Sequence, residues 1–194
     1  EELEKWRNRP LGHTPFVLLD ARYEKVRHGG SVVNCAVLVA TGVSIGGQRS
    51  VLGVSVSLSE AEAHWRTFLS SLKERGLHGV TMITSDDHQG LKAALKSVFN
   101  GVSWNRCHVH LQRNASAYVP KVAMRSAVAR DIANILSAPD RDEARRLLDL
   151  AVEKYRSKAP RLVAWMEDNI PEGFTVFILP YAMRRRLRTA NMIE

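Results

Sequence analysis

The chain has 194 residues, of which 45% are hydrophobic and 25% charged, and its 28 Lys and Arg against 20 Asp and Glu give a formal net charge of +8. Its ordinary apolar content, 12 Gly, 7 Pro and 2 Cys exclude a disordered tail, a collagen-like repeat and a disulfide scaffold. The sequence has no apolar run near the roughly 18 residues that span a bilayer, and no signal peptide, so we expect a soluble, cytoplasmic protein.

The basic charge is concentrated in the second half of the chain. Residues 1–104 carry 12 basic and 10 acidic side chains, whereas residues 105–194 carry 16 and 10. Of those 16 basic residues 13 are Arg, which suits bidentate contacts with phosphate. The surplus favours a polyanionic partner, nucleic acid first, with an ordinary solvated basic surface as the alternative.

Three apolar segments near the N-terminus predict consecutive strands, over residues 16–26, 32–45 and 49–58. Gly29-Gly30 and Gly46-Gly47 separate them and are typical of turns. The spacing therefore predicts an antiparallel meander.

Helices and strands then alternate. Ser59 and Glu62 form a capping-box pattern at the start of an amphipathic stretch that ends at Gly76. Residues 80–86 predict a fourth strand, an apolar stripe follows with helical spacing, and residues 102–109 predict a short fifth strand.

From about residue 112 the apolar spacing is helical throughout, with helices expected over 124–136, 140–155 and 161–169. The order of elements predicts the α/β class, a mixed sheet with helices packed on it and an all-α extension.

Two acidic residues lie where apolar strand segments end, Asp20 where the first predicted strand changes from apolar to polar and Asp86 where the fourth strand ends. Sites in open α/β sheets form beyond strand ends, and two carboxylates brought together there bind hard divalent cations through oxygen. The alternative is structural, because Asp commonly ends strands, and Asp86 or Asp87 is well placed to cap the next helix.

Glu194 is the last residue of a segment with helical spacing. If that segment is a helix, Leu187, Ala190, Asn191 and Glu194 lie near one face, which turns the carboxylate inward. A surface glutamate at a frayed helix end is the alternative.

Four arginines occupy five positions just before this segment and are candidates for contact with DNA phosphates, with a solvated helix face as the alternative. They are Arg184, Arg185, Arg186 and Arg188.

Cys107 and His110 form a Cys-x-x-His pattern in WNRCHVH. A structural zinc site needs four ligands and Cys35 is the only other cysteine, so we favour a packing or positioning role for the pair, with a zinc site and a Cys-His catalytic pair as alternatives.

Taken together, these segments resemble the catalytic region of the Mutator-like transposases of bacterial insertion sequences. The similarity is carried by LDARYEKVR, TSDDHQGLKAAL, WNRCHVHLQRN and RTANMIE, in the family's order. It implies a ribonuclease H-like fold and a DDE triad that falls on Asp20, Asp86 and Glu194. The family's Cys-x-x-His motif falls on Cys107 and His110.

The resemblance also implies how the chain is organised and what it binds. It implies a catalytic core over residues 1–111, a helical insertion over 112–180 and the start of the final core helix over 181–194. The implied activity is cleavage and strand transfer of double-stranded DNA at transposon ends and targets, with Mg²⁺, or Mn²⁺ as an alternative. We expect a homo-oligomer in the bacterial cytoplasm, associated with the nucleoid and not with a membrane.

Asp87 stands where the family usually has Ala, and Thr189-Ala190-Asn191 where it has Thr-Thr-Asn. The chain starts without Met and stops at Glu194, so we expect a fragment or an incomplete copy. Two alternatives to the transposase are a truncated, non-enzymatic DNA-binding remnant and a ribonuclease H-like nuclease that cleaves RNA-containing duplexes.

Overall fold

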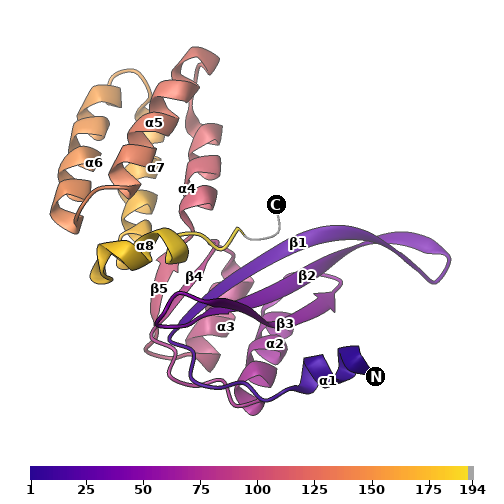
Figure 1. Cartoon of the computed structure of the whole chain (residues 1–194). Helices are drawn as coiled ribbons and strands as arrows, with labels where there is room; N and C mark the ends of the chain where they lie inside the picture. The colour runs from indigo at the N-terminus through magenta and orange to yellow at the C-terminus, as the bar shows by residue number, and fades with distance from the viewer. Residues whose placement is uncertain (192–194) are drawn as a thin grey trace. The chain divides into compact units, whose positions relative to one another are not determined.

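Figure 1 shows a computed structural model of the chain, which describes residues 1–191 and divides into two compact units. The first unit comprises residues 1–104 together with Ala190 and Asn191, and the second comprises residues 105–189. The boundaries expected from the sequence, at residues 112 and 181, differ from this division. Residues 105–111 and 181–189 group with the helical unit, where Leu111 is part of the hydrophobic core.

The sheet has five strands in the order β3-β2-β1-β4-β5. The antiparallel meander is confirmed, because β1 pairs antiparallel with β2 and β2 with β3, while β1 pairs parallel with β4. This mixed sheet with helices packed on it confirms the predicted α/β class. The strands are β1 (Phe16–His28), β2 (Ser31–Val43), β3 (Arg49–Ser57), β4 (Met82–Ser85) and β5 (Ser103–Arg106).

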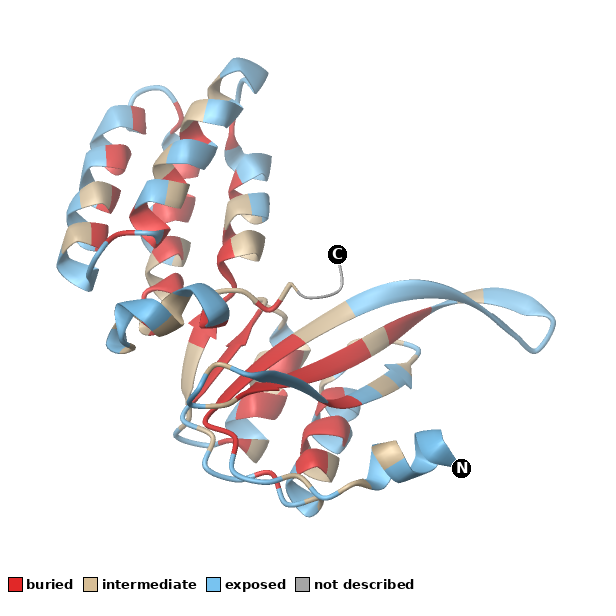
Figure 2. Ribbon diagram, viewed as in Figure 1, coloured by how far each residue is buried: buried red, intermediate tan, exposed pale blue. Residues whose placement is uncertain are grey.

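The β1–β2 hairpin is longer than its neighbours. Its turn has φ of 56° at Gly29 and 82° at Gly30, in the left-handed region that favours glycine. Residues 22–34 of the hairpin are almost all exposed, as the pale blue ribbon in Figure 2 shows, because neither β3 nor β4 extends beside them.

The first unit also contains α1 (Glu2–Asn8), α2 (Glu62–Glu74) and α3 (Gln89–Val98). The predicted apolar stripes are buried: side chains of α2 and α3, among them Trp65, Leu69 and Leu91, pack with Val17 and Leu19 of β1 in one hydrophobic core. The two helices therefore cover one face of the sheet.

The predicted caps of these two helices are wrong. Ala61, not Ser59, is the N-cap of α2, because the helix starts two residues later than the capping-box pattern places it. The N-cap of α3 is His88, so neither Asp86 nor Asp87 caps that helix.

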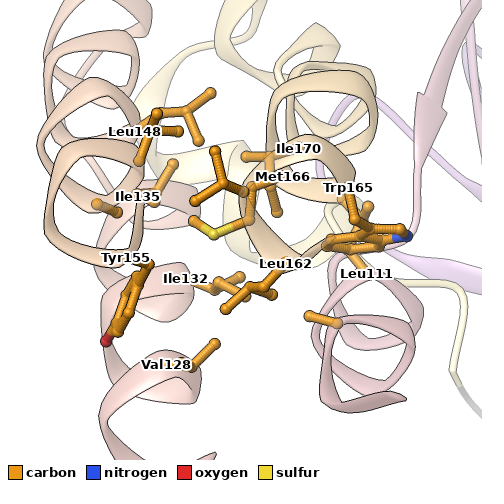
Figure 3. Packing of buried hydrophobic residues seen from close by; sticks show 14 of the residues in the cluster. Leu111, Val128, Ile132, Ile135, Leu148, Tyr155, Leu162, Trp165, Met166 and Ile170 are labelled. Atoms are coloured by element: carbon orange, nitrogen blue, oxygen red, sulfur yellow. The ribbon is translucent and has the colours of Figure 1, made fainter. Parts of the chain in front are cut away.

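Apart from Asn105 and Arg106 at the end of β5, the regular elements of the second unit are helices. Figure 3 shows its core, in which Ile132 and Ile135 of α5 lie against Leu162 and Met166 of α7, with Leu111 of α4 alongside. The α-helices are α4 (His108–Ala115), α5 (Arg125–Leu136), α6 (Arg141–Tyr155), α7 (Pro160–Asn169) and α8 (Tyr181–Leu187). Short 3₁₀ turns connect them: η1 (Ser116–Tyr118), η2 (Val122–Met124), η3 (Ile170–Gly173) and η4 (Thr175–Ile178).

Two predicted elements end early. The fifth strand stops at Arg106, because His108 already begins α4. The C-terminal helix stops at Leu187, and residues 189–191 are not helical, so the expected helical face joining Leu187 to Ala190 and Asn191 does not form. Within residues 1–191, no helix has the length and apolar character needed to cross a membrane.

Candidate metal and nucleic-acid site

The register of the two central strands relates the positions of Asp20 and Asp86. β1 and β4 run parallel, with Val17 opposite Ile83 and Leu18 opposite Thr84. If that register continued for two more residues, Asp20 would lie opposite Asp86, which follows the end of β4. At the usual spacing of about 4.8 Å between neighbouring strands, the two carboxylates would then be within reach of a shared ion.

Alternation along the strands indicates the sheet face to which each carboxylate belongs. Leu19 of β1 and Ile83 of β4 belong to the core formed with α2 and α3. Because successive side chains of a strand point to opposite faces, Asp20 belongs to the face turned away from those helices, and Asp86 would follow it if β4 continued by one residue. Both residues are half-buried, so they combine a fixed backbone with access to solvent.

Asp86 follows a strand whose end is tightly held. Ser85 is fully buried, and its Oγ accepts a hydrogen bond of 2.8 Å from Trp104 Nε1 and donates one of 2.9 Å to the carbonyl oxygen of Asp86. Asp86 Oδ1 accepts a hydrogen bond of 2.7 Å from the backbone N–H of Asp87. These contacts orient the Asp86 carboxylate before any ligand binds.

Asp87 has a different partner. Its Oδ1 lies 2.8 Å from Lys92 Nζ, and that ammonium also lies 4.4 Å from the centroid of the Trp104 ring. The sequence analysis did not single out Lys92, because a lysine five residues after an aspartate gives no signal without the fold. The ion pair distinguishes Asp87 from Asp86, although the two are adjacent in sequence.

Glu194, the third acidic residue of the predicted triad, lies outside the described residues. Within residues 1–191, no group of three or more His, Cys, Asp and Glu side chains is arranged to bind a metal ion.

The four predicted DNA-contacting arginines fall into two kinds. Arg185 and Arg186 are exposed on α8. Arg184 and Arg188 are half-buried and bonded within the helical unit, Arg184 to backbone carbonyl groups and Arg188 to Ser137 Oγ at 3.1 Å. Arg184 and Arg188 therefore also stabilise the local structure.

The Cys-x-x-His residues both belong to α4. Cys107 is its N-cap, fully buried, with Sγ 3.3 Å from Thr189 Oγ1, and His110 is half-buried in the first turn. Between them lies His108. It is buried, and its Nε2–H donates to the carbonyl oxygen of Gly173 at 2.8 Å. Burial, with a smaller contribution from the charge of Arg188, lowers the His108 pKa to about 4.

Residues 1–194 match the family model described as "Transposase, Mutator family". The chain therefore belongs to the Mutator family of transposases. It is 53% identical over 194 residues to the transposase for insertion sequence element IS406 of Burkholderia multivorans, and 38% identical over 196 residues to that for ISRM5 of Rhizobium meliloti. These alignments cover 100% of this chain but 50% and 49% of the relatives. This Mutator-family chain thus spans about half the length of those curated relatives.

Among solved structures, this Mutator-family chain is similar to the HTLV-2 integrase catalytic core domain in complex with magnesium, with a TM-score of 0.31 and 12% identity. That match covers 68% of this chain and 90% of the integrase chain.

Proposed function

We propose that this chain carries the catalytic carboxylates of a DNA transposase, which cleaves and joins DNA strands at the ends of an insertion sequence. The observation that supports this most is the parallel register of β1 and β4, which would set Asp20 opposite Asp86 if it continued two residues beyond Leu18 and Thr84. Two carboxylates at this spacing repel each other unless a cation lies between them, so such a pair fits a cation-binding role.

The donor set fits Mg²⁺, with Mn²⁺ as an alternative, because both ions prefer carboxylate oxygen. A divalent ion bound there supplies a lowered pKa for water or a hydroxyl nucleophile and neutralises charge on the phosphate. Asp20 and Asp86 would hold the metal, with Glu194 as the third carboxylate. The backbone N–H of Asp87 donates to one oxygen of the Asp86 carboxylate, which helps to fix its orientation.

Double-stranded DNA is the proposed substrate, both as transposon end and as target. The basic surplus of residues 105–194 supports this, since arginine guanidinium groups bind backbone phosphates without reading sequence. Exposed Arg185 and Arg186 are the first candidates for this contact. Assembly as a homo-oligomer is part of the same proposal.

The proposal is tested by nicking of a transposon-end duplex by the full-length protein with Mg²⁺ and with EDTA. We expect nicking only with Mg²⁺, and loss to background in Asp20→Asn, Asp86→Asn and Glu194→Gln. Asp87→Asn is the matched control, because it neutralises the adjacent carboxylate and removes the ion pair to Lys92. It should retain most of the activity.

Wild-type nicking rates in both Asp20→Asn and Asp86→Asn would refute the assignment. Faster cleavage of an RNA–DNA hybrid than of the DNA duplex would favour the ribonuclease H-like nuclease. DNA binding without product at any divalent concentration would favour the non-enzymatic remnant.

A further inference from the structure

The helical unit contains a cavity of about 440 Å³ between the end of α5, the η4 turn and α8. A cavity of this size falls in the range of small-molecule sites and exceeds what a single ion needs. Aromatic and cationic side chains dominate its lining, which we call the arginine–tyrosine pocket: Phe177, Tyr181, Arg184, Arg185 and Arg188.

Arg184 fixes the shape of this pocket. Its guanidinium donates to the carbonyl oxygens of Pro139 at 2.6 Å, Leu179 at 2.8 Å and Phe177 at 3.3 Å. Its Cζ also lies 5.2 Å from the centroid of the Phe177 ring and 5.7 Å from that of Tyr181. Such cation–π contacts hold the two rings beside the charge.

Among the described residues, no acidic side chain balances the positive charge of the three arginines that line the pocket. None of the lining residues is acidic, and within residues 1–191 no carboxylate forms an ion pair with Arg184, Arg185 or Arg188. The charge of Arg188 contributes to the lowered pKa of buried His108. Three like charges around one cavity favour an anionic ligand, and guanidinium groups suit phosphate.

Tyr181 adds a second kind of contact. It is 70% exposed, an unusual state for a large aromatic side chain, while Arg184 lies beside its ring. An exposed aromatic ring next to arginines suits the stacking of a nucleobase, which single-stranded nucleic acid offers and a closed duplex does not. Phosphate contacts alone would need no such ring.

We propose that the arginine–tyrosine pocket binds one unpaired nucleotide of a DNA strand, with the base on Tyr181 and its phosphate at Arg185 and Arg188. The choice of DNA rests on the proposed function. The pocket would give the helical unit its own contact with the substrate, one that selects strands opened or unpaired during the reaction.

The test is fluorescence anisotropy of the full-length protein with a short single-stranded oligonucleotide and with a duplex of the same length. It is run in EDTA, so that binding is measured without metal-dependent chemistry. We expect Tyr181→Ala to weaken single-strand binding about tenfold and duplex binding little, since stacking on an aromatic ring contributes at roughly that level. Tyr181→Phe keeps the ring and should bind as the wild type does.

A second pair of variants tests the contribution of arginine charge to single-strand binding. Arg185→Ala should weaken single-strand binding several-fold, whereas Arg145→Ala, which removes an equally exposed arginine from α6, should change it little. A 2-aminopurine base in the oligonucleotide reports stacking directly, since its fluorescence is expected to fall on binding to the wild type but not to Tyr181→Ala.

Equal affinity of wild type and Tyr181→Ala for the single strand, or unchanged 2-aminopurine fluorescence on binding to the wild type, would overturn the proposal. Asp20→Asn should bind the single strand as the wild type does. If Asp20→Asn abolishes nicking but Tyr181-dependent binding persists, the result concerns the proposed carboxylate site alone. If Tyr181-dependent binding is absent but nicking still requires Asp20, only the pocket proposal fails.

Discussion

His108 is a buried imidazole that makes folding sensitive to acid. Its Nε2–H donates to Gly173, while within residues 1–191 its buried Nδ1 has no hydrogen-bond partner. Burial holds the pKa of His108 at about 4 in the folded chain, against an ordinary value of 6.5. Between those two pKa values, His108 is protonated in the unfolded chain but neutral in the folded chain, so a fall in pH favours unfolding.

We expect this one group to lower the free energy of unfolding by about 3 kcal/mol as the pH falls. The decrease begins near pH 6.5 and is complete by about pH 4. Urea unfolding at pH 7.5 and pH 4.5 measures it. His108→Gln keeps a donor for Gly173 but does not titrate, so it should lose less stability over this interval than the wild type. Identical pH dependence of the two proteins would contradict the assignment.

At the scale of elements, Gly90 is required where α3 passes the start of α2. A Cβ at this position would lie 2.6 Å from the carbonyl oxygen of Glu60 and 2.9 Å from the backbone nitrogen of Glu62. Backbone atoms cannot move aside as a flexible side chain can, so the helices would have to separate.

Gly90→Ala should therefore destabilise the protein by about 1–2 kcal/mol, even though alanine is the better helix former. Gly12→Ala is the matched control, because a Cβ there meets no heavy atom within 4 Å. Its effect should stay within about 0.5 kcal/mol. Both values come from denaturant unfolding, and a stable Gly90→Ala variant would show that the two helices can adjust.

The strands and the buried helix faces could be predicted from the sequence, because apolar periodicity reflects burial against a sheet. Trp65, Leu69 and Leu91 are buried as their spacing indicates. The residues at which helices and strands begin and end could not be predicted, because they depend on contacts made elsewhere in the fold. Ser59 precedes its helix by too many residues to cap it, and the C-terminal helix stops at Leu187.

The candidate site shows the same division. The sequence pointed to Asp20 and Asp86 separately. The structure places Asp20 inside β1 (Phe16–His28), not at a strand end as predicted, whereas Asp86 does follow the last residue of β4. The sequence could not separate Asp86 from Asp87, since the ion pair to Lys92 depends on where α3 begins. The sequence indicated the arginines of the arginine–tyrosine pocket, but not the aromatic side chains that line it with them.

On the scale of the whole molecule, the chain has two hydrophobic cores. Leu69 belongs to the core of the sheet unit and Ile132 to that of the helical unit, and both are fully buried. Truncating either to Ala should cost about 2–5 kcal/mol. Because each truncation leaves a cavity within one core, we expect amide hydrogen exchange to accelerate mainly in the unit that carries the substitution.

The matched pair Leu69→Ala and Ile132→Ala makes this measurable by mass spectrometry. Equal acceleration across residues 1–104 and 105–189 in both variants would show that the two cores unfold as one cooperative unit.

The net charge of +8 also acts at the scale of the whole molecule, through the salt dependence of DNA binding. Each arginine that neutralises a phosphate releases a counterion, which adds about 0.9 to the slope of log affinity against log salt. Arg185→Ala should therefore lower the slope for duplex DNA by about one.

Arg146→Ala provides the contrast, because its guanidinium makes two hydrogen bonds of 2.7 Å to the Glu143 carboxylate and its charge is already balanced. It should leave the slope nearly unchanged, although it removes the same formal charge. Titrations at several salt concentrations compare the two variants. Equal reductions would mean that the DNA responds to the total charge of the protein rather than to unpaired arginines at particular positions.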